Sequence, residues 1–561
     1  MPETSPVPLR DQVRAAIARA WDKGAGSGAL PADPERGSGE IVVDRPGNPE
    51  HGDFATNLAL RLAKPLKMAP PAIAHILVGA LNAERAANQG SPIASAAVAG
   101  PGFVNLRVTD RALEELIASV LADPAGWGRL PAGTGRHVNV EFVSANPTGP
   151  LTVGNARGAF VGDLLARVLE AGGQRVTREY YFNDSGAQVR NLGNSVIAVI
   201  EGAPVPEDGY HGEYVAELAK DVPSDLRVSD PGGDDAAWRV GRWASDRVRR
   251  GIEASLERLG VHFDVWTTEG SLVEDGWVRR AIDRLREAGH LFEDGGATWF
   301  RSTTFGDDKD RVIVRSDGSL TYFAFDIGYL LEKFSRGFDH LIYIWGADHH
   351  GTVARVRNAA EAMGLEAAAV EMILTGWVRF IRDGEELSMS KRAGTFITLD
   401  ELLAELGTDA ARWFFASRGA NVNMDIDLEL AKKQSSENPV YYVQYAHARI
   451  ASILRKAAAT GIAAAAGVEG SLSGAPEARL ARLVARYPEV VEDAATGQET
   501  QGITTYATEL ATEFHAFYRD ARVVDPDEPE RSAKRLALVS ATRITLANAL
   551  GLLGISAPEE M

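Results

Sequence analysis

The chain contains no cysteine among its 561 residues. Disulfides, thiolate nucleophiles and cysteine-ligated zinc sites are therefore excluded. Long apolar runs are also missing, because the apolar stretch at residues 72–81 is interrupted by His75 and is too short to span a bilayer. The N-terminus has no basic segment followed by an apolar core, so a signal peptide is not indicated and we expect a cytoplasmic protein with no membrane contact.

Excess positive charge is absent as well. The chain holds 77 acidic and 59 basic residues and has a net charge of −18, which makes it a poor non-specific binder of nucleic acid. A specific RNA partner needs only a local basic surface. Residues 431–456 hold a single acid, Glu437, and five basic residues: Lys432, Lys433, Arg449, Arg455 and Lys456. By residue type alone, this segment is more typical of a solvated helix face than of an RNA-binding surface.

The composition, 45% hydrophobic and 24% charged, is that of a soluble globular protein long enough for two to four domains. Residues 1–123 combine helical spacing at 9–21, a Gly/Pro/Ser-rich connector at 24–39 and strand-like alternation at 101–107. They predict a small α+β domain. A linker rich in glycine and proline follows at 124–135.

Strands and helices alternate through residues 124–415, with strands expected at 137–143, 175–181 and 340–345 and helices at 155–171 and 352–363. This rhythm predicts a Rossmann-like, doubly wound parallel sheet that binds ligands at the carboxyl ends of its strands. Residues 200–310 break the rhythm and predict an insertion. Residues 416–561 predict an α-helical bundle, with helices at 439–459, 477–487, 503–518 and 532–553.

Residues 141–158, EFVSANPTGPLTVGNARG, are the most informative segment. A strand, a Gly/Pro turn and a helix N-terminus together make a phosphate site, although the turn is neither a dinucleotide fingerprint nor a P-loop. The segment resembles the ATP-binding turn of class I aminoacyl-tRNA synthetases, in its arginyl form. Thr152 and Asn155 replace two histidines of that family, and they can form hydrogen bonds but carry no proton charge near neutral pH. The resemblance implies that Thr152, Gly154 and Asn155 bind ATP, and that Thr152 and Asn155 act in catalysis.

A second segment, WGADHHG at 345–351, follows a strand and opens a helix. Its histidine pair has no third clustered ligand, so we expect no metal site. The segment resembles the ribose and adenosine side of the arginyl-tRNA synthetase pocket. That likeness implies ATP contacts from Gly346, Asp348 and His349, with Asp348 also near arginine.

A third segment, LSMSKRAG at 387–394, resembles the second class I signature, Lys-Met-Ser-Lys-Ser, with Ser388 in place of the first lysine. The resemblance implies that Met389, Ser390 and Lys391 bind ATP. A loop lysine such as Lys391 can follow charge onto the leaving pyrophosphate and is therefore a catalytic candidate. The preceding Asp383-Gly384 predicts a hairpin. Ser388-x-x-Lys391 also fits β-lactamase-type hydrolases, but no Ser-Asp-Asn or Lys-Thr-Gly accompanies it.

Residues for a cationic substrate occur in the order typical of the arginyl family. A guanidinium is planar with five donors, so its recognition requires carboxylates at fixed angles. The resemblance implies that Glu141 and Asp326 hold the guanidinium, that Tyr322 packs against it and that Asn146 holds the amino-acid end. Ser144 and Asp348 complete the implied arginine site. Taken alone, a strand glutamate such as Glu141 is usually a structural ion-pair partner.

Two further segments resemble tRNA-binding parts of the family. HGDFATN at 51–57 is similar to its N-terminal domain, which contacts the tRNA elbow, and gives Phe54 and Asn57 as candidates. NPVYYVQYAHAR at 438–449 is similar to its first bundle helix, beside the anticodon stem, and gives Tyr441, Gln444 and Arg449. Aromatic residues at helical spacing are more often core than base-stacking platforms. The segment at 183–188, NDSGAQ, is an ordinary turn and helix cap.

The resemblance spans almost the whole chain and implies an arginine–tRNA ligase. In that family the carboxylate of L-arginine attacks the α-phosphate of ATP, pyrophosphate leaves, and the 2′-hydroxyl of the tRNA(Arg) terminal adenosine takes the aminoacyl group. Mg²⁺ is expected on the phosphates, without a protein ligand that the sequence identifies. We also expect a monomer that needs bound tRNA before it activates arginine.

Two alternatives remain. A catalytically silent tRNA-binding paralogue would not need Glu141, Tyr322 and Asp326 together. A ligase for another amino acid would place a neutral side chain beside two buried carboxylates, which is costly, although lysine remains formally possible.

Overall fold

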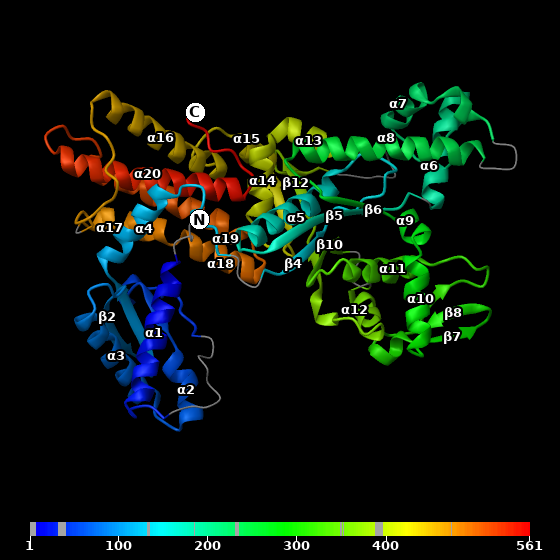
Figure 1. Cartoon of the computed structure of the whole chain (residues 1–561). Coiled ribbons are helices and arrows are strands. Elements are labelled where there is room, and N and C mark those ends of the chain that lie inside the picture. The colour runs from blue at the N-terminus through cyan, green and yellow to red at the C-terminus, as the bar shows by residue number, and fades with distance from the viewer. Residues whose placement is uncertain are drawn as a thin grey trace.

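The computed structural model describes residues 7–31, 41–131, 135–184, 186–229, 235–347, 351, 353–387, 397–472 and 474–561. An N-terminal unit in blue lies beneath a helical bundle drawn in yellow to red, and a central sheet lies beside the bundle (Figure 1). No helix in these ranges is long and apolar enough to cross a membrane.

The N-terminal unit is α+β, as predicted. Its antiparallel sheet has the order β1-β3-β2, formed by β1 (Phe54–Thr56), β2 (Ile93–Ala99) and β3 (Phe103–Val108). The helices are α1 (Leu9–Gly26), α2 (Leu58–Leu66), α3 (Pro70–Ala87) and α4 (Asp110–Ala122). Gly52 precedes β1 with φ of 105°, and a Cβ there would lie 2.5 Å from the carbonyl oxygen of Leu106. Only glycine therefore fits the turn that lays β1 against β3.

The central sheet has five parallel strands in the order β11-β10-β4-β5-β6. They are β4 (His137–Glu141), β5 (Arg175–Phe182), β6 (Val265–Thr268), β10 (His340–Gly346) and β11 (Val370–Thr375). The chain winds from β4 outward to β6 and then returns to β10 on the other side of β4. The predicted doubly wound sheet is thus confirmed, and its switch point, where such sheets bind ligands, lies between β4 and β10.

Three helices carry the residues around this switch point. They are α5 (Val153–Ala171), α11 (Tyr322–Ser335) and α12 (Val353–Ala362). Of the 19 residues in α5, 13 are buried. A helix that is apolar almost all round is enclosed, and α5 packs against both the sheet and the helices α14 (Thr408–Ala416) and α18 (Tyr487–Gly497).

The prediction of one continuous insertion at 200–310 is wrong, because a strand of the central sheet lies in the middle of this region. Helices α6 (Ala187–Glu201), α7 (Glu213–Asp221) and α8 (Ala236–Arg258) do leave the sheet and have a core of their own. The chain then returns, and β6 pairs in parallel with β5 from Glu179↔Val265 to Phe182↔Thr268. Four residues are too few to show a period, so the sequence pattern concealed this strand.

A second excursion follows β6. It contains α9 (Glu269–Glu274), α10 (Trp277–Glu287) and an antiparallel sheet of β7 (Leu291–Asp294), β8 (Ala297–Phe300) and β9 (Arg311–Val314). In Figure 1 this excursion lies below α6, α7 and α8, on the side of the sheet away from the N-terminal unit.

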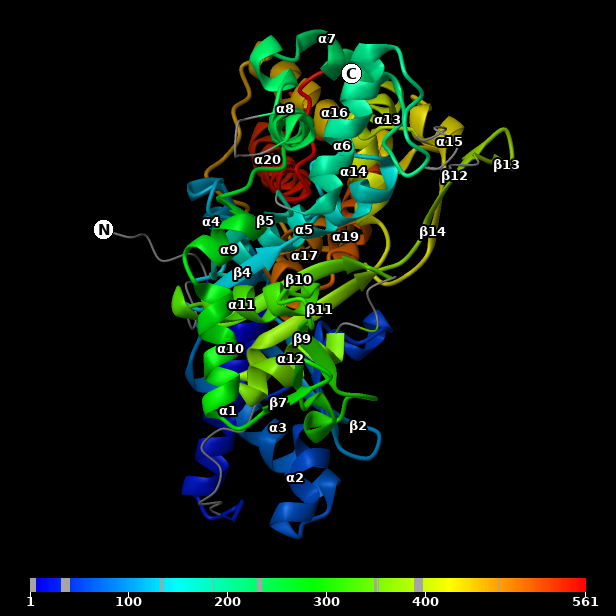
Figure 2. The same cartoon turned by 90° about the vertical axis from the view of Figure 1, so that its right-hand side faces the viewer.

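The predicted hairpin at Asp383-Gly384 is confirmed. Strands β12 (Val378–Arg382) and β13 (Glu385–Glu386) flank these two residues, whose φ angles are 52° and 82°. Beyond residue 415, β14 (Met424–Asp427) pairs in parallel with β12, so the catalytic unit ends after that boundary. The hairpin projects at the right of Figure 2. Helices α13 (Leu399–Leu406), α14 (Thr408–Ala416) and α15 (Leu428–Lys432) lie close by. The boundary at residue 123 stays a prediction.

The predicted helical bundle is confirmed. It comprises α16 (Pro439–Ala459), α17 (Ala475–Ala485), α18 (Tyr487–Gly497), α19 (Gln501–Asp520) and α20 (Pro529–Leu552). The helix expected at 477–487 ends two residues early, and Pro488 lies in the first turn of α18, which the pattern did not predict. Proline fits a first helical turn, where its missing N–H costs nothing.

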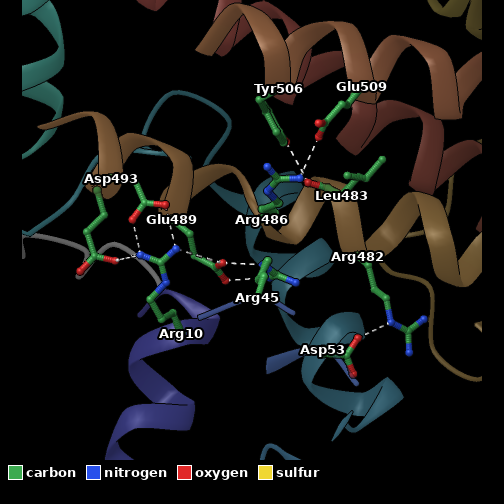
Figure 3. A network of polar contacts seen from close by, with 11 residues as sticks. Arg10, Arg45, Asp53, Arg482, Leu483, Arg486, Glu489, Asp493, Tyr506 and Glu509 are labelled. Carbon is green, nitrogen blue, oxygen red and sulfur yellow. Dashed lines mark hydrogen bonds and ion pairs between the residues drawn. The ribbon is translucent and has the colours of Figure 1, made fainter. Parts of the chain in front are cut away.

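Ion pairs fix the N-terminal unit to the bundle (Figure 3). Arg45 pairs with Glu489 at 2.7 Å, and Arg10 lies between Glu489 and Asp493. The Glu489 side chain is 1% exposed. Arg482 of α17 pairs with Asp53, in the turn before β1, also at 2.7 Å.

Candidate active site

A cavity of about 1030 Å³ lies at the sheet switch point. It is lined by the segment after β4, the first turn of α5, α11, the end of β10 and the start of β12. It brings together nine of the fourteen residues predicted to bind ATP or arginine: Glu141, Ser144, Asn146, Thr152, Gly154, Asn155, Tyr322, Asp326 and Gly346. The other five, Asp348, His349, Met389, Ser390 and Lys391, lie outside the described residues. The lining does include Ala347 and Leu387, which immediately precede these two segments in the sequence.

The first turn of α5 is capped by the two residues that replace the family's histidines. Asn155 Oδ1 accepts hydrogen bonds from the backbone N and from Oγ1 of Thr152, both at 3.1 Å. Because Oδ1 is occupied, the Asn155 amide Nδ2 is the group left to donate toward a ligand. The helix N-terminus therefore presents backbone N–H groups and one side-chain amide to the cavity.

Backbone hydrogen bonds tie this turn to the segment that follows the Lys391 signature. Leu399 N donates to Leu151 O at 2.9 Å, and Val153 N donates to Ile397 O at 3.2 Å. Thr152 and Thr398 form an isolated antiparallel bridge. The start of α5 and the segment at residues 397–399, more than 200 residues apart in the sequence, are thus joined directly.

The backbone after β4 is strained. Val143 and Ser144 have φ angles of 67° and 42°, a region that non-glycine residues occupy at a cost of about 1–3 kcal/mol each. The surrounding contacts hold this conformation. Ser144 Oγ donates to Glu141 Oε1 at 3.1 Å and accepts from Tyr181 N at 3.2 Å. The strain aims Ser144 and the following Asn146 at the cavity.

Asn146 is held by the 183–188 segment. Its Oδ1 accepts from Asn183 N at 3.2 Å, and its Nδ2 donates to Gln188 Oε1 at 2.8 Å. Asn183 itself caps a turn by accepting from Gly186 N at 2.7 Å. The segment is thus a turn and cap, as the sequence indicated, and it also positions Asn146.

Four acids line the cavity: Glu386 is exposed, and Glu141, Asp326 and Glu269 are buried or half-buried. Glu141 at the end of β4 is 4% exposed and pairs with Lys333 at 2.6 Å. Asp326 is half-buried and, within the described part of the chain, its carboxylate has no hydrogen bond or ion pair. Glu269 begins α9, is 5% exposed, and accepts from Tyr181 Oη at 3.0 Å and Asn183 Nδ2 at 2.9 Å.

Burial and mutual repulsion shift the pKa values of Glu141, Asp326 and Glu269. Burial, reinforced by the charges of Glu141 and Glu269, raises the pKa of Asp326 to about 7. Burial also raises the pKa of Glu269. It likewise raises the pKa of Glu141, against the opposing effect of Lys333. An enclosed site with several mutually repelling carboxylates favours a cationic ligand, since a cation would relieve the repulsion between them.

The sequence did not identify Glu269. It follows β6, inside the region interpreted as an insertion, and no motif marks it. Its position at the first turn of the helix after a sheet strand is the one signal available.

Aromatic side chains border the cavity. Tyr322, in the first turn of α11, is 64% exposed, and Trp377, between β11 and β12, is 66% exposed. Exposed aromatic faces at a cavity can stack on planar groups such as a guanidinium or a base.

Two predicted tRNA contacts are wrong because the side chains are buried. Phe54 is 0% exposed, and the guanidinium of Arg45 lies 4.4 Å from its ring centroid. Gln444 is 8% exposed and donates to Asp409 Oδ2 at 2.8 Å and to Ser556 O at 3.0 Å. Phe54 thus belongs to the core of the N-terminal unit, and Gln444 holds the C-terminal segment. Asn57 is half-buried and stays a prediction.

Tyr441 and Arg449 lie at a partly exposed aromatic surface on α16 and α19. Tyr441 stacks on Tyr445, with centroids 6.4 Å apart and planes within 6°. The Arg449 guanidinium lies 4.4 Å from the ring centroid of Tyr518. In contrast, the cations at the start of the basic segment are neutralised, since Lys432 pairs with Glu405 and Glu429, and Lys433 pairs with Glu437.

Among the residues with described positions, no group of three or more His, Asp or Glu side chains is arranged to hold a metal ion. The cavity carboxylates instead bond to protein donors or lie singly, so they do not form a magnesium cage.

Comparison with known proteins assigns the fold. Three family models match: Arginyl tRNA synthetase N terminal domain at residues 8–108, tRNA synthetases class I (R), catalytic domain at 213–451, and DALR anticodon binding domain at 443–561. The arginine–tRNA ligase of Citrifermentans bemidjiense is 43% identical over 568 residues, covering 99% of this chain and 100% of the relative. The arginine–tRNA ligase of Bacillus subtilis is 44% identical over 538 residues, 93% of this chain and 94% of its own.

The chain belongs to the arginyl-tRNA synthetase family. The solved arginyl-tRNA synthetase of Thermus thermophilus shares its fold, with a TM-score of 0.76 at 23% identity over 99% of this chain and 100% of the other. The three family-model matches leave residues 109–212 of the chain uncovered, and these include the Thr152–Asn155 turn.

Proposed function

We propose that this synthetase ligates L-arginine to tRNA(Arg) through arginyl-adenylate, releasing AMP and pyrophosphate, in protein synthesis. The observation that carries this proposal is the cavity itself. It combines a helix N-terminus suited to phosphates with three acids suited to a cation, at the switch point of a class I sheet.

The arginine side chain would enter between α11 and α9. Asp326, whose carboxylate has no partner in the described part of the chain, would take the guanidinium together with Glu269. Tyr322 would pack on the planar guanidinium face. Ser144 and Asn146, held in the strained segment after β4, would orient the amino-acid end toward ATP.

ATP would lie against the first turn of α5. The backbone of Gly154 and the Asn155 amide would meet the phosphates, while Thr152 orients that amide. Gly346, Asp348 and His349 would hold the ribose and base. Met389, Ser390 and Lys391 would close over the triphosphate, and Lys391 would follow charge onto the pyrophosphate.

No protein nucleophile is needed for this reaction. The arginine carboxylate displaces pyrophosphate from the α-phosphate, and the tRNA 2′-hydroxyl then displaces AMP from the adenylate. Catalysis is therefore positioning plus charge stabilisation. Mg²⁺ is expected to arrive with ATP, and we assign no step to it because the described residues offer no carboxylate cluster for it.

The proposed partners are tRNA(Arg), L-arginine and ATP. On tRNA, Asn57 of the N-terminal unit would contact the elbow, and Tyr441 and Arg449 would contact the anticodon side. We propose a monomer that works in the cytoplasm.

The direct test is aminoacylation of tRNA(Arg) with purified protein, with Asp326→Asn as the variant. We expect charging with arginine and none with lysine. Asp326→Asn should raise the KM for arginine by on the order of 100-fold, as for loss of a charged hydrogen-bond partner in an enclosed site, with little change in the KM for ATP. An unchanged arginine KM would refute the proposed arginine site.

A further inference from the structure

Helix α11 connects the arginine site to a buried cation. The helix carries Tyr322 and Asp326 at the cavity, and two turns later it carries Lys333, which is 0% exposed. Lys333 Nζ donates to Glu141 Oε2 at 2.6 Å. It also lies 4.3 Å from the ring centroid of Tyr329 and 4.1 Å from that of Tyr343. One carboxylate and two aromatic faces thus enclose the ammonium, which compensates for its lost hydration.

Glu141 is committed on both oxygens. Oε1 accepts from Ser144 Oγ at 3.1 Å, and Oε2 accepts from Lys333. A guanidinium pairs best with a carboxylate that offers both oxygens side by side. Asp326 has no such bonds among the described residues. Both oxygens of Glu269 also accept hydrogen bonds, from Tyr181 and Asn183, but these donors are neutral and leave the charge of Glu269 uncompensated, whereas Lys333 neutralises Glu141. Of the three acids, Glu141 is therefore the least suited to receive the substrate cation.

A second ion pair anchors the same helix. Arg336, three residues after Lys333, donates to both oxygens of Glu179 at 2.7 and 2.8 Å. Glu179 lies on β5, directly beside Glu141 in the strand register. Burial alone would raise the pKa of Glu179, but the charges of Lys333 and Arg336 outweigh it and hold that pKa below its usual value. The two pairs therefore fix α11, and with it Tyr322 and Asp326, against the sheet.

We propose that Lys333 is a charge-balancing and positioning residue of the arginine site. It neutralises Glu141 and keeps the Glu141 carboxylate oriented to accept the hydrogen bond from Ser144. Asp326 and Glu269, rather than Glu141, therefore receive the substrate cation. The inference rests on the proposed arginine site. Lys333 would act as a permanent positive charge that neutralises Glu141, so that the remaining acids of the site accept only one more cationic side chain, that of the substrate.

Charge-matched variants test this assignment. Glu141→Gln leaves the Lys333 ammonium without its counter-charge beside the arginine site. One unit charge about 8–12 Å away changes binding by about 10- to 30-fold at an effective dielectric of about 20. We therefore expect the KM for arginine to rise by that factor, with the KM for ATP and the kcat changed less than about threefold. The pair Glu141→Gln/Lys333→Met removes both charges and should return the KM for arginine to within about threefold of the parent.

The contrary result is equally defined. If Glu141 itself holds the guanidinium, the charge-matched pair will bind arginine as weakly as Glu141→Gln alone, and the inference fails. Thermal unfolding should accompany each assay, and Glu141→Gln/Lys333→Gln, which keeps a polar contact between the two side chains, serves if methionine packs badly. Asp326→Asn separates the two levels of the account. If it leaves the arginine KM unchanged, the proposed site is wrong irrespective of Lys333.

Citrulline, the neutral analogue of arginine, gives a second readout. A stranded Lys333 ammonium repels arginine and not citrulline, so inhibition by citrulline should change less than about threefold in Glu141→Gln. Equal losses for both ligands would indicate a distorted site and would contradict the proposed charge balance.

Discussion

Asn155 Oδ1 accepts two hydrogen bonds from Thr152, one from its backbone N and one from its Oγ1. The two residues that replace the family's histidines thus contact each other rather than acting separately. Their contact resembles a capping box, in which a residue at the third helical position bonds back to the N-cap. It fixes which end of the Asn155 amide accepts from Thr152 and which end faces the cavity.

Asn155→Asp separates the helix-capping role of Asn155 from its proposed contact with ATP. A carboxylate keeps the acceptor for Thr152 and suits a helix N-terminus, so stability should change by less than about 1 kcal/mol. It removes the amide donor and places a negative charge at the triphosphate. We expect the rate of adenylate formation to fall by on the order of 10²–10³, as for loss of one transition-state donor.

Asn155→Ala is the matched control, since it removes both functions. It should lower stability by about 1 kcal/mol in addition to slowing adenylation. Thermal unfolding and pyrophosphate exchange measure the two effects. Equal activity of Asn155→Asp and the parent would contradict a role for the Asn155 amide in ATP binding.

Arginine binding should depend on pH through Asp326. Burial, followed by repulsion from Glu141 and Glu269, raises the pKa of this carboxyl to about 7. A guanidinium binds the ionised form, so the KM for arginine should rise by about tenfold as the pH falls from 8 to 6. The KM of Asp326→Asn should be high at both pH values. A flat profile for the parent would show that Asp326 does not receive the cation.

The same shift predicts how Asp326 affects stability. A carboxyl whose pKa is raised on folding binds its proton more tightly in the native state, so the ligand-free protein loses stability as the pH rises from about 4 through 7. Asp326→Asn should therefore be more stable than the parent at pH 8 and nearly equal to it at pH 4. Denaturant unfolding without arginine measures this difference, and the opposite order at pH 8 would contradict the shift.

Glu489→Gln should loosen the N-terminal unit from the bundle. Glu489 is the buried partner of both Arg10 and Arg45, and removing one charge from a buried pair costs up to about 3–5 kcal/mol. The arginines are partly exposed and recover some hydration, so we expect about 2 kcal/mol. Limited proteolysis near residue 124 should accelerate, and tRNA affinity should fall about tenfold. Glu492→Gln, at a more exposed carboxylate beside Arg10, is the control and should have little effect.

On α16, we expect the partly exposed Arg449 to contact tRNA and the buried Gln444 not to contact it. Arg449→Ala removes a cation from the partly exposed aromatic surface formed by Tyr441, Tyr445 and Tyr518, and it should weaken tRNA binding by roughly 10-fold and lower its salt dependence. Gln444→Ala should leave tRNA affinity unchanged but lower thermal stability, because Gln444 holds Ser556. Filter binding at two salt concentrations distinguishes the two variants.

Much of the site was predictable, because each motif lies directly after a strand or at a helix start. Glu141 ends β4, Thr152 and Asn155 follow it at the start of α5, and Asp326 lies one turn into α11. These local relationships are visible in a linear sequence. The doubly wound sheet followed from the alternation of strands and helices in the same way.

Other parts depended on contacts between distant residues. Glu269 reaches the cavity only because the four-residue strand β6 rejoins the sheet. The partner of Glu141 is Lys333, 192 residues further along the chain, and no local pattern pairs them. Phe54 and Gln444 lie in motifs that resemble tRNA-binding segments. Yet Phe54 is covered by Arg45, and Gln444 is covered by the C-terminal segment. Burial of this kind is a property of packing and not of residue type.

ATP–pyrophosphate exchange with purified protein tests the account most directly. The assay contains arginine with and without tRNA(Arg), and lysine replaces arginine in a parallel reaction. The account predicts exchange with arginine and tRNA together and none with lysine, because Asp326 and Glu269 select arginine while the Thr152–Asn155 turn remains competent. Retained tRNA binding without any exchange would contradict it and would identify a tRNA-binding protein whose altered turn no longer activates an amino acid.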